Sequence, residues 1–154
     1  MRFALFGKEF QAGKTVSIHR LIDSLKARGA EIYIERTFFR YITSALGMEA
    51  EVSGVFDNYN FDVDFVISIG GDGTFLRAAS MVGSKATPII GVNTGRLGFL
   101  ADIHPDEIDH AIAEIVDGHY AVEPHAVIMV EADGEIIEGS PFALNDIAVL
   151  KRDN

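Results

Sequence analysis

The residues with the clearest chemical potential are Gly70-Gly71-Asp72-Gly73, which follow the apolar run DFVISI at positions 64–69. Glycine permits positive φ and lets a ligand approach the backbone closely. A helical pattern begins at once, near Thr74, so its free N–H groups and positive dipole end would point at the same turn. The stretch is therefore typical of a phosphate-binding turn that contains one carboxylate. Such a carboxylate could orient or deprotonate a hydroxyl group, or hold Mg²⁺.

A purely structural interpretation of this turn stays open. Asp72 or Thr74 could be the N-cap of the helix, and the glycines could serve only a tight turn. Arg77 lies on the first turn of the predicted helix, outside its apolar stripe. It could bind an anion, or it could belong to a solvated helix face.

A second glycine-containing stretch, GKEFQAGKT at positions 7–15, stands between a strand-like and a helical pattern. A Walker A loop has that setting, but it needs four residues between its glycines, and Gly7 and Gly13 enclose five. We therefore interpret the two glycines as turn residues and Lys14 as a solvated helix residue. The histidines lack the H-E-x-x-H spacing of a zinc site, and the sequence predicts no metal site built from protein ligands alone.

Two further motifs carry polar residues next to apolar runs. GVNTGRLGFLADI at 91–103 places Asn93 and Phe99 after a strand-like run, and ALNDIAVL at 143–150 sets Asn145 and Asp146 inside another. Adjacent strand residues face opposite sides, and a buried Asn or Asp needs hydrogen-bond partners. The structural alternatives are a loop with Phe99 and Leu100 in the core, and a turn at a strand end.

The elements that would position these residues alternate along the chain. Strand patterns cover 2–7, 30–35, 64–69 and 88–92, and helical patterns cover 12–29, 36–47, 74–83 and 104–119. The alternation predicts an α/β fold, a Rossmann-like parallel sheet with flanking helices. Ligands of such sheets collect at the carboxyl ends of the strands, where the Gly70–Gly73 turn would lie.

The pattern changes after Tyr120. Residues 126–139 alternate with period two around Asp133-Gly134, which predicts a β-hairpin. We therefore predict an α/β domain over residues 1–118, which carries the GGDG loop. Residues 119–154 are expected to be the beginning of a β-rich domain that is truncated.

Composition limits the class of protein. The chain has 154 residues, 48% of them hydrophobic, which suffices for a sizeable core. It contains no cysteine, which fits a reducing compartment and a cytoplasmic location. No apolar run approaches the roughly 20 residues of a membrane span, so we expect no membrane partner. The net charge of −10 disfavours non-specific binding to nucleic acid.

Three motifs in chain order resemble the NAD kinases: GGDGT at 70–74, GVNTGRLGFL at 91–100, and ND at 145–146. The first also has close relatives in diacylglycerol kinases, sphingosine kinases and phosphofructokinases. The second, with Asn93, Gly95, Gly98 and Phe99, suits the NAD kinases rather than the lipid kinases. The resemblance covers most of residues 64–150.

The resemblance implies that ATP, with Mg²⁺ or another divalent metal, phosphorylates the 2′-hydroxyl of the adenosine ribose of NAD to give NADP. It implies that Asp72 is the catalytic base and that the full-length protein is a homo-oligomer. It also assigns the NAD-binding residues, which are Asp72, Gly73, Arg77, Asn145 and Asp146. Asn93 and Phe99 are candidates for further nucleotide contacts, and Phe99 would pack near an adenine.

The sequence departs from the family pattern in two respects. Asp146 stands where many members have the longer Glu. The family's second domain also continues beyond this point with segments that complete the NAD pocket, so we expect little activity from the 154-residue chain alone. Two alternatives remain open: a lipid or other small-alcohol kinase of the same superfamily, and a non-catalytic nucleotide-binding domain.

Overall fold

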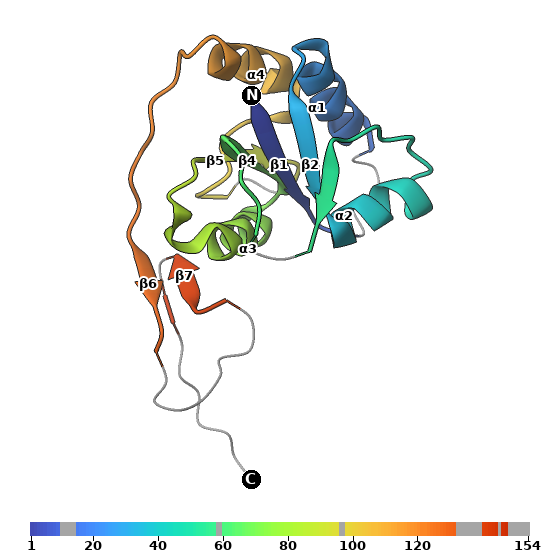
Figure 1. The fold of residues 1–154 in the computed structure, drawn as a ribbon. Coiled ribbons are helices and arrows are strands. Elements are labelled where there is room, and N and C mark those ends of the chain that lie inside the picture. The colour runs from blue at the N-terminus through green and yellow to red at the C-terminus, as the bar shows by residue number, and fades with distance from the viewer. Residues whose placement is uncertain (10–14, 58–59, 96–97, 132–139, 145, 148–154) are drawn as a thin grey trace.

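The computed structural model of the chain describes residues 1–9, 15–57, 60–95, 98–131, 140–144 and 146–147. Its main feature is a five-stranded parallel sheet with the order β3-β2-β1-β4-β5 (Figure 1). The strands are β1 (Arg2–Gly7), β2 (Glu31–Glu35), β3 (Gly54–Phe56), β4 (Phe65–Gly70) and β5 (Ile89–Asn93). After β1 the chain adds β2 and β3 on one side of this strand, and then β4 and β5 on its other side. The carboxyl ends of β1 and β4 are thus neighbours at the point where the strand order reverses.

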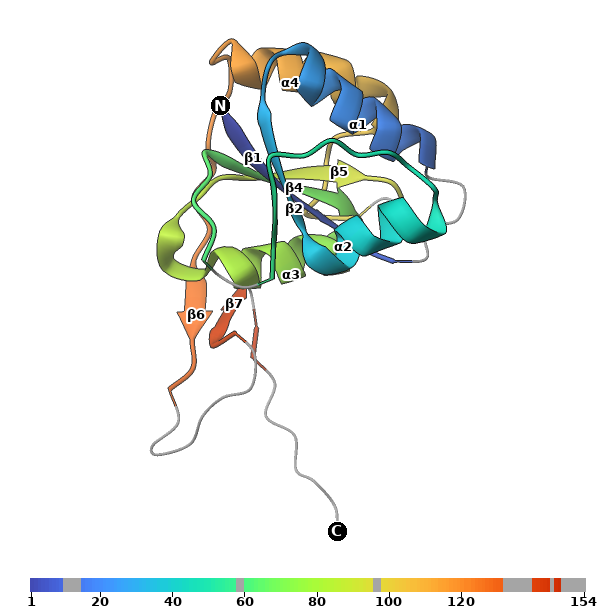
Figure 2. The ribbon, with the colours of Figure 1, turned by 45° about the vertical axis from the view of Figure 1, so that its right-hand side comes forward.

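Helices cover both faces of this sheet, as Figures 1 and 2 show. One face carries α1 (Thr15–Ala27) and α4 (Ile108–Val116), and the other carries α3 (Asp72–Val82). The alternation of strand side chains explains the two layers, because Phe3 and Leu5 join the core under α1 and α4, whereas Ala4 and Phe6 join the core under α3. The predicted α/β fold with a parallel sheet is confirmed.

Two predicted helices differ in detail from the structure. The segment after β2 forms α2 (Arg36–Arg40), which continues as a π-helical turn over Tyr41–Ala45. The helix predicted over 104–119 begins with a short 3₁₀ turn, Pro105–Glu107, before α4. A second short 3₁₀ turn, Gly83–Lys85, follows α3. No helix among the described residues is long and apolar enough to cross a membrane.

The end of β1 corrects one interpretation. Gly7 is the last residue of the strand rather than a turn residue, and a Cβ there would lie 2.2 Å from the ring of Phe38. Phe38 is fully buried and belongs to the core under α1. Gly7 therefore makes room for an aromatic ring from α2. Most of the loop that follows, including Gly13 and Lys14, lies outside the described residues.

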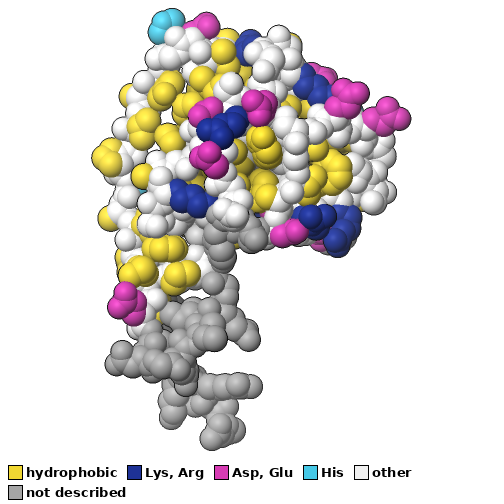
Figure 3. Space-filling view, in the orientation of Figure 1, with side chains coloured by type: hydrophobic (Ala, Val, Ile, Leu, Met, Phe, Trp, Pro, Cys, Tyr) yellow, Lys and Arg dark blue, Asp and Glu magenta, His cyan; other side chains and the backbone are white. Residues whose placement is uncertain are grey.

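The last described elements form a separate antiparallel ribbon of β6 (Val127–Met129) and β7 (Phe142–Leu144). The hairpin turn predicted at Asp133-Gly134 lies outside the described residues. The ribbon contacts α3, where the Ser140 hydroxyl donates to the carbonyl of Ser80 at 2.7 Å. All three residues of β6 are exposed, and Figure 3 shows apolar side chains gathered over the ribbon. The domain boundary near residue 118 stays a prediction.

Candidate active site

The glycine-rich turn joins the end of β4 to the start of α3 at the carboxyl edge of the sheet. Gly71 is the N-cap of α3, and its carbonyl accepts the N–H groups of Thr74 and Phe75. No side chain of the described residues caps this helix end. The interpretation of Asp72 or Thr74 as the N-cap is therefore wrong: Asp72 is the first residue of the helix, and its carboxylate makes other contacts.

The Asp72 carboxylate holds the loop that follows β5. Its two oxygens accept the backbone N–H groups of Phe99 at 2.9 Å and of Leu100 at 3.1 Å. These two N–H donors stabilise the charged form and hold the pKa of Asp72 below its ordinary value. Desolvation opposes this shift to a smaller extent, and the N–H of Ala101 adds a still smaller lowering of the pKa. A Cβ at Gly98 would lie 2.2 Å from Asp72 Oδ1, so only glycine allows this close approach.

The loop between Asn93 and Ile103 is fastened at both ends. The side-chain oxygen of Asn93 accepts the N–H of Gly95 at 2.8 Å, and Thr94 N–H donates to the carbonyl of Gly70 at 2.9 Å. Ile103 returns beside β5, where it exchanges backbone hydrogen bonds with Gly91 and Asn93. The loop is thus tied to the same turn that carries Asp72.

Phe99 stands at the tip of this loop and is 96% exposed. The interpretation of Phe99 as a core residue is therefore wrong, while Leu100 is half-buried. Its ring therefore lies at the surface, on a loop whose backbone is bonded to the carboxylate of the glycine-rich turn. Gly73 lies on the first turn of α3, and a Cβ there would meet no atom of the described residues within 4 Å. The backbone at Gly73 thus borders open space.

Arg77 has specific partners, although its side chain is partly exposed. Its Nη2 donates to the Gly7 carbonyl at 2.6 Å and lies 3.6 Å from a carboxylate oxygen of Glu35. The guanidinium carbon is also 6.0 Å from the centre of the Phe6 ring. Glu35 was missed in the sequence, where it looks like the polar end of a strand followed by Arg36.

The ND motif is only partly described. Asn145 lies outside the described residues, and Asp146 is an exposed residue just after β7. β7 contacts α3 near Ser80 and Gly83, at the opposite end of the helix from Asp72. An 11-residue helix is about 15 Å long. The contacts of the described residues therefore do not bring Asp146 to the Gly70–Gly73 turn.

The described part of the chain contains no group of three His, Asp or Glu side chains that could hold a metal ion. Asp72 is the carboxylate of the turn itself, and both of its oxygens already accept N–H groups. The described residues thus do not form a cage for Mg²⁺.

The glycine-bounded carboxylate thus lies at the topological switch point of a parallel α/β sheet, which is where domains of this class bind their ligands. The chain belongs to the NAD kinase family, because the ATP-NAD kinase N-terminal domain matches residues 16–120. NAD kinases of Bacteroides fragilis and Porphyromonas gingivalis are 49% and 39% identical to it over 154 and 153 residues. Those matches cover 100% and 99% of this chain, and 53% and 52% of the two relatives. The chain thus spans about half the length of the curated relatives it matches.

Solved structures agree with the fold. A yeast NADH kinase complexed with NADH superposes with a TM-score of 0.67 at 17% identity, over 94% of this chain and 46% of that one. An NAD kinase from Archaeoglobus fulgidus in complex with ATP superposes with a TM-score of 0.50 at 27% identity, over 77% of this chain and 38% of that one. The first likeness concerns the fold alone.

Proposed function

We propose that the complete gene product is an NAD kinase, which transfers the γ-phosphoryl group of ATP to the 2′-hydroxyl of the adenosine ribose of NAD. A P–O bond forms to the ribose oxygen, the bond between the β- and γ-phosphates breaks, and ADP and NADP leave. The observation that carries the proposal is the placement of Asp72. Its carboxylate lies at the start of α3 and accepts the backbone N–H of Phe99, whose side chain is exposed.

Asp72 would act mainly by aligning the hydroxyl. Its lowered pKa makes it a poor proton acceptor at neutral pH. Phosphoryl transfer has a loose transition state in which the attacking hydroxyl loses its proton late, so positioning and charge stabilisation dominate. A carboxylate fixed by two N–H groups is suited to hold a hydroxyl in line and to accept its proton as the bond to phosphorus forms.

The remaining contacts of NAD follow from the same proposal. The Gly73 backbone would approach the ribose, and the Phe99 ring would stack on the adenine. Arg77 would contact the anionic part of the dinucleotide, and Asn93 would support the loop that carries Phe99. Asn145 and Asp146 would bind hydroxyl and base groups of NAD.

The other proposed properties concern the metal ion and the assembly. Mg²⁺ or another divalent ion would enter with ATP and neutralise phosphate charge. We further propose that the complete protein is a homo-oligomer in the cytoplasm and that it binds neither nucleic acid nor membranes. The absence of cysteine supports a reducing compartment, and the net charge of −10 argues against nucleic acid.

The test is direct. The complete gene product, incubated with ATP, Mg²⁺ and NAD, should produce NADP, measured with an NADP-specific dehydrogenase. Diacylglycerol and sphingosine serve as competing acceptors in parallel assays. Phosphorylation of a lipid with NAD left unchanged would replace the proposal with a lipid kinase, and nucleotide binding without any transfer would replace it with a binding domain.

A further inference from the structure

Four residues, which we call the Glu35 cluster, connect the ends of two strands to α3. They are Gly7, Glu35, Phe38 and Arg77. Glu35 is the last residue of β2 and is 7% exposed. Its Oε2 accepts the N–H of Phe38 at 3.0 Å and lies 3.6 Å from Arg77 Nη2. Since the same nitrogen donates to Gly7 at 2.6 Å, one carboxylate and one guanidinium link β1, β2, α2 and α3.

The choice of glutamate at this position requires an explanation beyond helix capping. The usual caps are Ser, Thr, Asp and Asn, which are shorter and satisfy the same backbone donors. A buried carboxylate is costly to desolvate unless it is paired. The longer side chain of Glu35 reaches Arg77 while it still caps α2. Its length and charge are therefore explained by the arginine.

Arg77 lies on the same helix as Asp72, five positions later. Its guanidinium is held against the end of β1, yet the side chain as a whole is 44% exposed. Part of the arginine thus reaches the surface at the carboxyl edge of the sheet. An arginine at such an edge binds an anionic ligand more tightly when its long side chain is already held in one orientation, because ordering a freely rotating side chain on binding costs entropy.

We propose that Glu35 is a positioning residue for NAD binding, which fixes Arg77 in the orientation that meets the anionic part of the dinucleotide. The inference rests on the proposed function and deepens it. Glu35 itself does not touch the substrate. Its carboxylate forms an ion pair with the guanidinium at the ends of β1 and β2. The side chain of Arg77 therefore already has a fixed orientation before the ligand binds.

The first experiment replaces the charge and keeps the cap. In Glu35→Gln of the complete gene product, the side-chain carbonyl still accepts the N–H of Phe38, whereas the ion pair with Arg77 is lost. We expect the Kd and KM for NAD to rise about 3- to 10-fold, the scale of coupling between contacting residues, with kcat and the KM for ATP little changed. The matched control is Glu51→Gln, since Glu51 pairs with Lys26 and its side chain is 96% exposed.

The second experiment tests whether the effect passes through the arginine. If it does, the Glu35→Gln and Arg77→Gln double variant should bind NAD no more weakly than Arg77→Gln alone, with Kd measured by titration calorimetry. Additive losses would overturn the inference, as would a lower unfolding temperature of Glu35→Gln with an unchanged Kd. A wild-type protein that binds no NAD would remove the proposed function and this inference together, whereas an unchanged Kd in Glu35→Gln removes the inference alone.

Discussion

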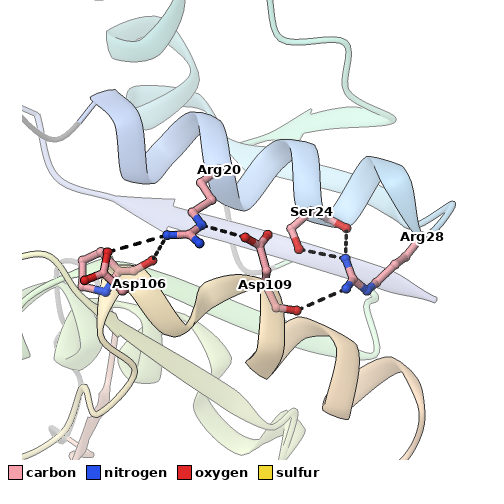
Figure 4. A network of polar contacts seen from close by, with 6 residues as sticks. Arg20, Ser24, Arg28, Asp106 and Asp109 are labelled. Atoms are coloured by element: carbon pink, nitrogen blue, oxygen red, sulfur yellow. Dashed lines mark hydrogen bonds and ion pairs between the residues drawn. The ribbon is translucent and has the colours of Figure 1, made fainter.

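Two aspartates of this molecule have lowered pKa values for different reasons. Asp72 at the glycine-rich turn is stabilised by the uncharged backbone donors of Phe99 and Leu100. Asp109 on α4 is stabilised chiefly by the guanidinium of Arg20, whose Nε lies 2.7 Å away. Figure 4 shows Asp109 in a network with Ser24 and Arg28, in which α1 is fastened to α4.

The two kinds of partner leave the two carboxylates with different chemical properties. Backbone N–H groups hold a carboxylate in place without cancelling its charge, so Asp72 can still attract a hydroxyl proton or a cation. A guanidinium adds a positive charge that balances the carboxylate, so the Asp109–Arg20 pair serves to link α1 to α4. The direction of a pKa shift alone therefore does not identify a catalytic carboxylate, whereas the identity of its partners is informative.

The largest effect is expected from Asp72→Asn in the complete gene product. The amide keeps the shape of the side chain but loses the charge, and its NH2 group replaces one of the two oxygens that accept N–H groups. We expect kcat for NADP formation to fall at least about 10²-fold. Folding should be nearly intact, as measured by thermal unfolding. Asp109→Asn is the matched control, because it makes the same substitution at a neutralised site and should leave kcat unchanged. Equal kcat values for Asp72→Asn and wild type would remove Asp72 from the mechanism.

A smaller loss is expected from Gly98→Ala. The added methyl group would lie 2.2 Å from Asp72 Oδ1, so the carboxylate must turn away from the N–H groups of Phe99 and Leu100. We expect kcat to fall about 10-fold, since misplacement of a catalytic group by about 1 Å is costly. If the methyl acts only through Asp72, then the double variant with Asp72→Asn should be no slower than Asp72→Asn alone. A further loss in the double variant would mean that Gly98 contributes independently.

The smallest effect is expected from Asp109→Asn on stability. The folded pKa of Asp109 is depressed, so its contribution is present at neutral pH and is lost as the pH falls below the ordinary carboxyl value of 3.8 toward the folded one. The unfolding temperature of the variant should thus lie slightly below that of wild type at pH 7, and the gap should close in acid. Because Arg20 and Asp109 are partly exposed, the gap should also shrink at high salt. A gap that is independent of pH would show that the ion pair does not stabilise the fold.

The sequence predicts the sheet well because two of its central strands, β1 and β4, are short apolar runs that end at glycines. β4 is buried along its whole length, and its nearly continuous apolar sequence FVISIG is typical of a central strand in a parallel sheet. The sequence does not predict β3, because this edge strand has three residues and is too short to show the alternation of apolar and polar residues that marks a strand. The π-helical turn after α2 has no sequence signature that period analysis detects.

The candidate site was predicted in part. Asp72 and Gly73 stand out because glycines flank a carboxylate where a strand changes to a helix. The partners of Asp72 could not be predicted, since backbone N–H groups occur at every residue and those of Phe99 and Leu100 lie 27 and 28 positions away. Glu35 was missed for a related reason, because its ion pair with Arg77 depends on the order β2-β1-β4, which the sequence alone does not give.

The exposure of Phe99 also has a calorimetric consequence. A ring that is 96% exposed keeps nearly its full shell of water. A base that covers the ring would remove apolar surface from water, and such burial lowers the heat capacity of the complex below that of its separate parts. Association at this site should then release more heat as the temperature rises, and replacing the benzyl side chain of Phe99 by the methyl of alanine should flatten that dependence.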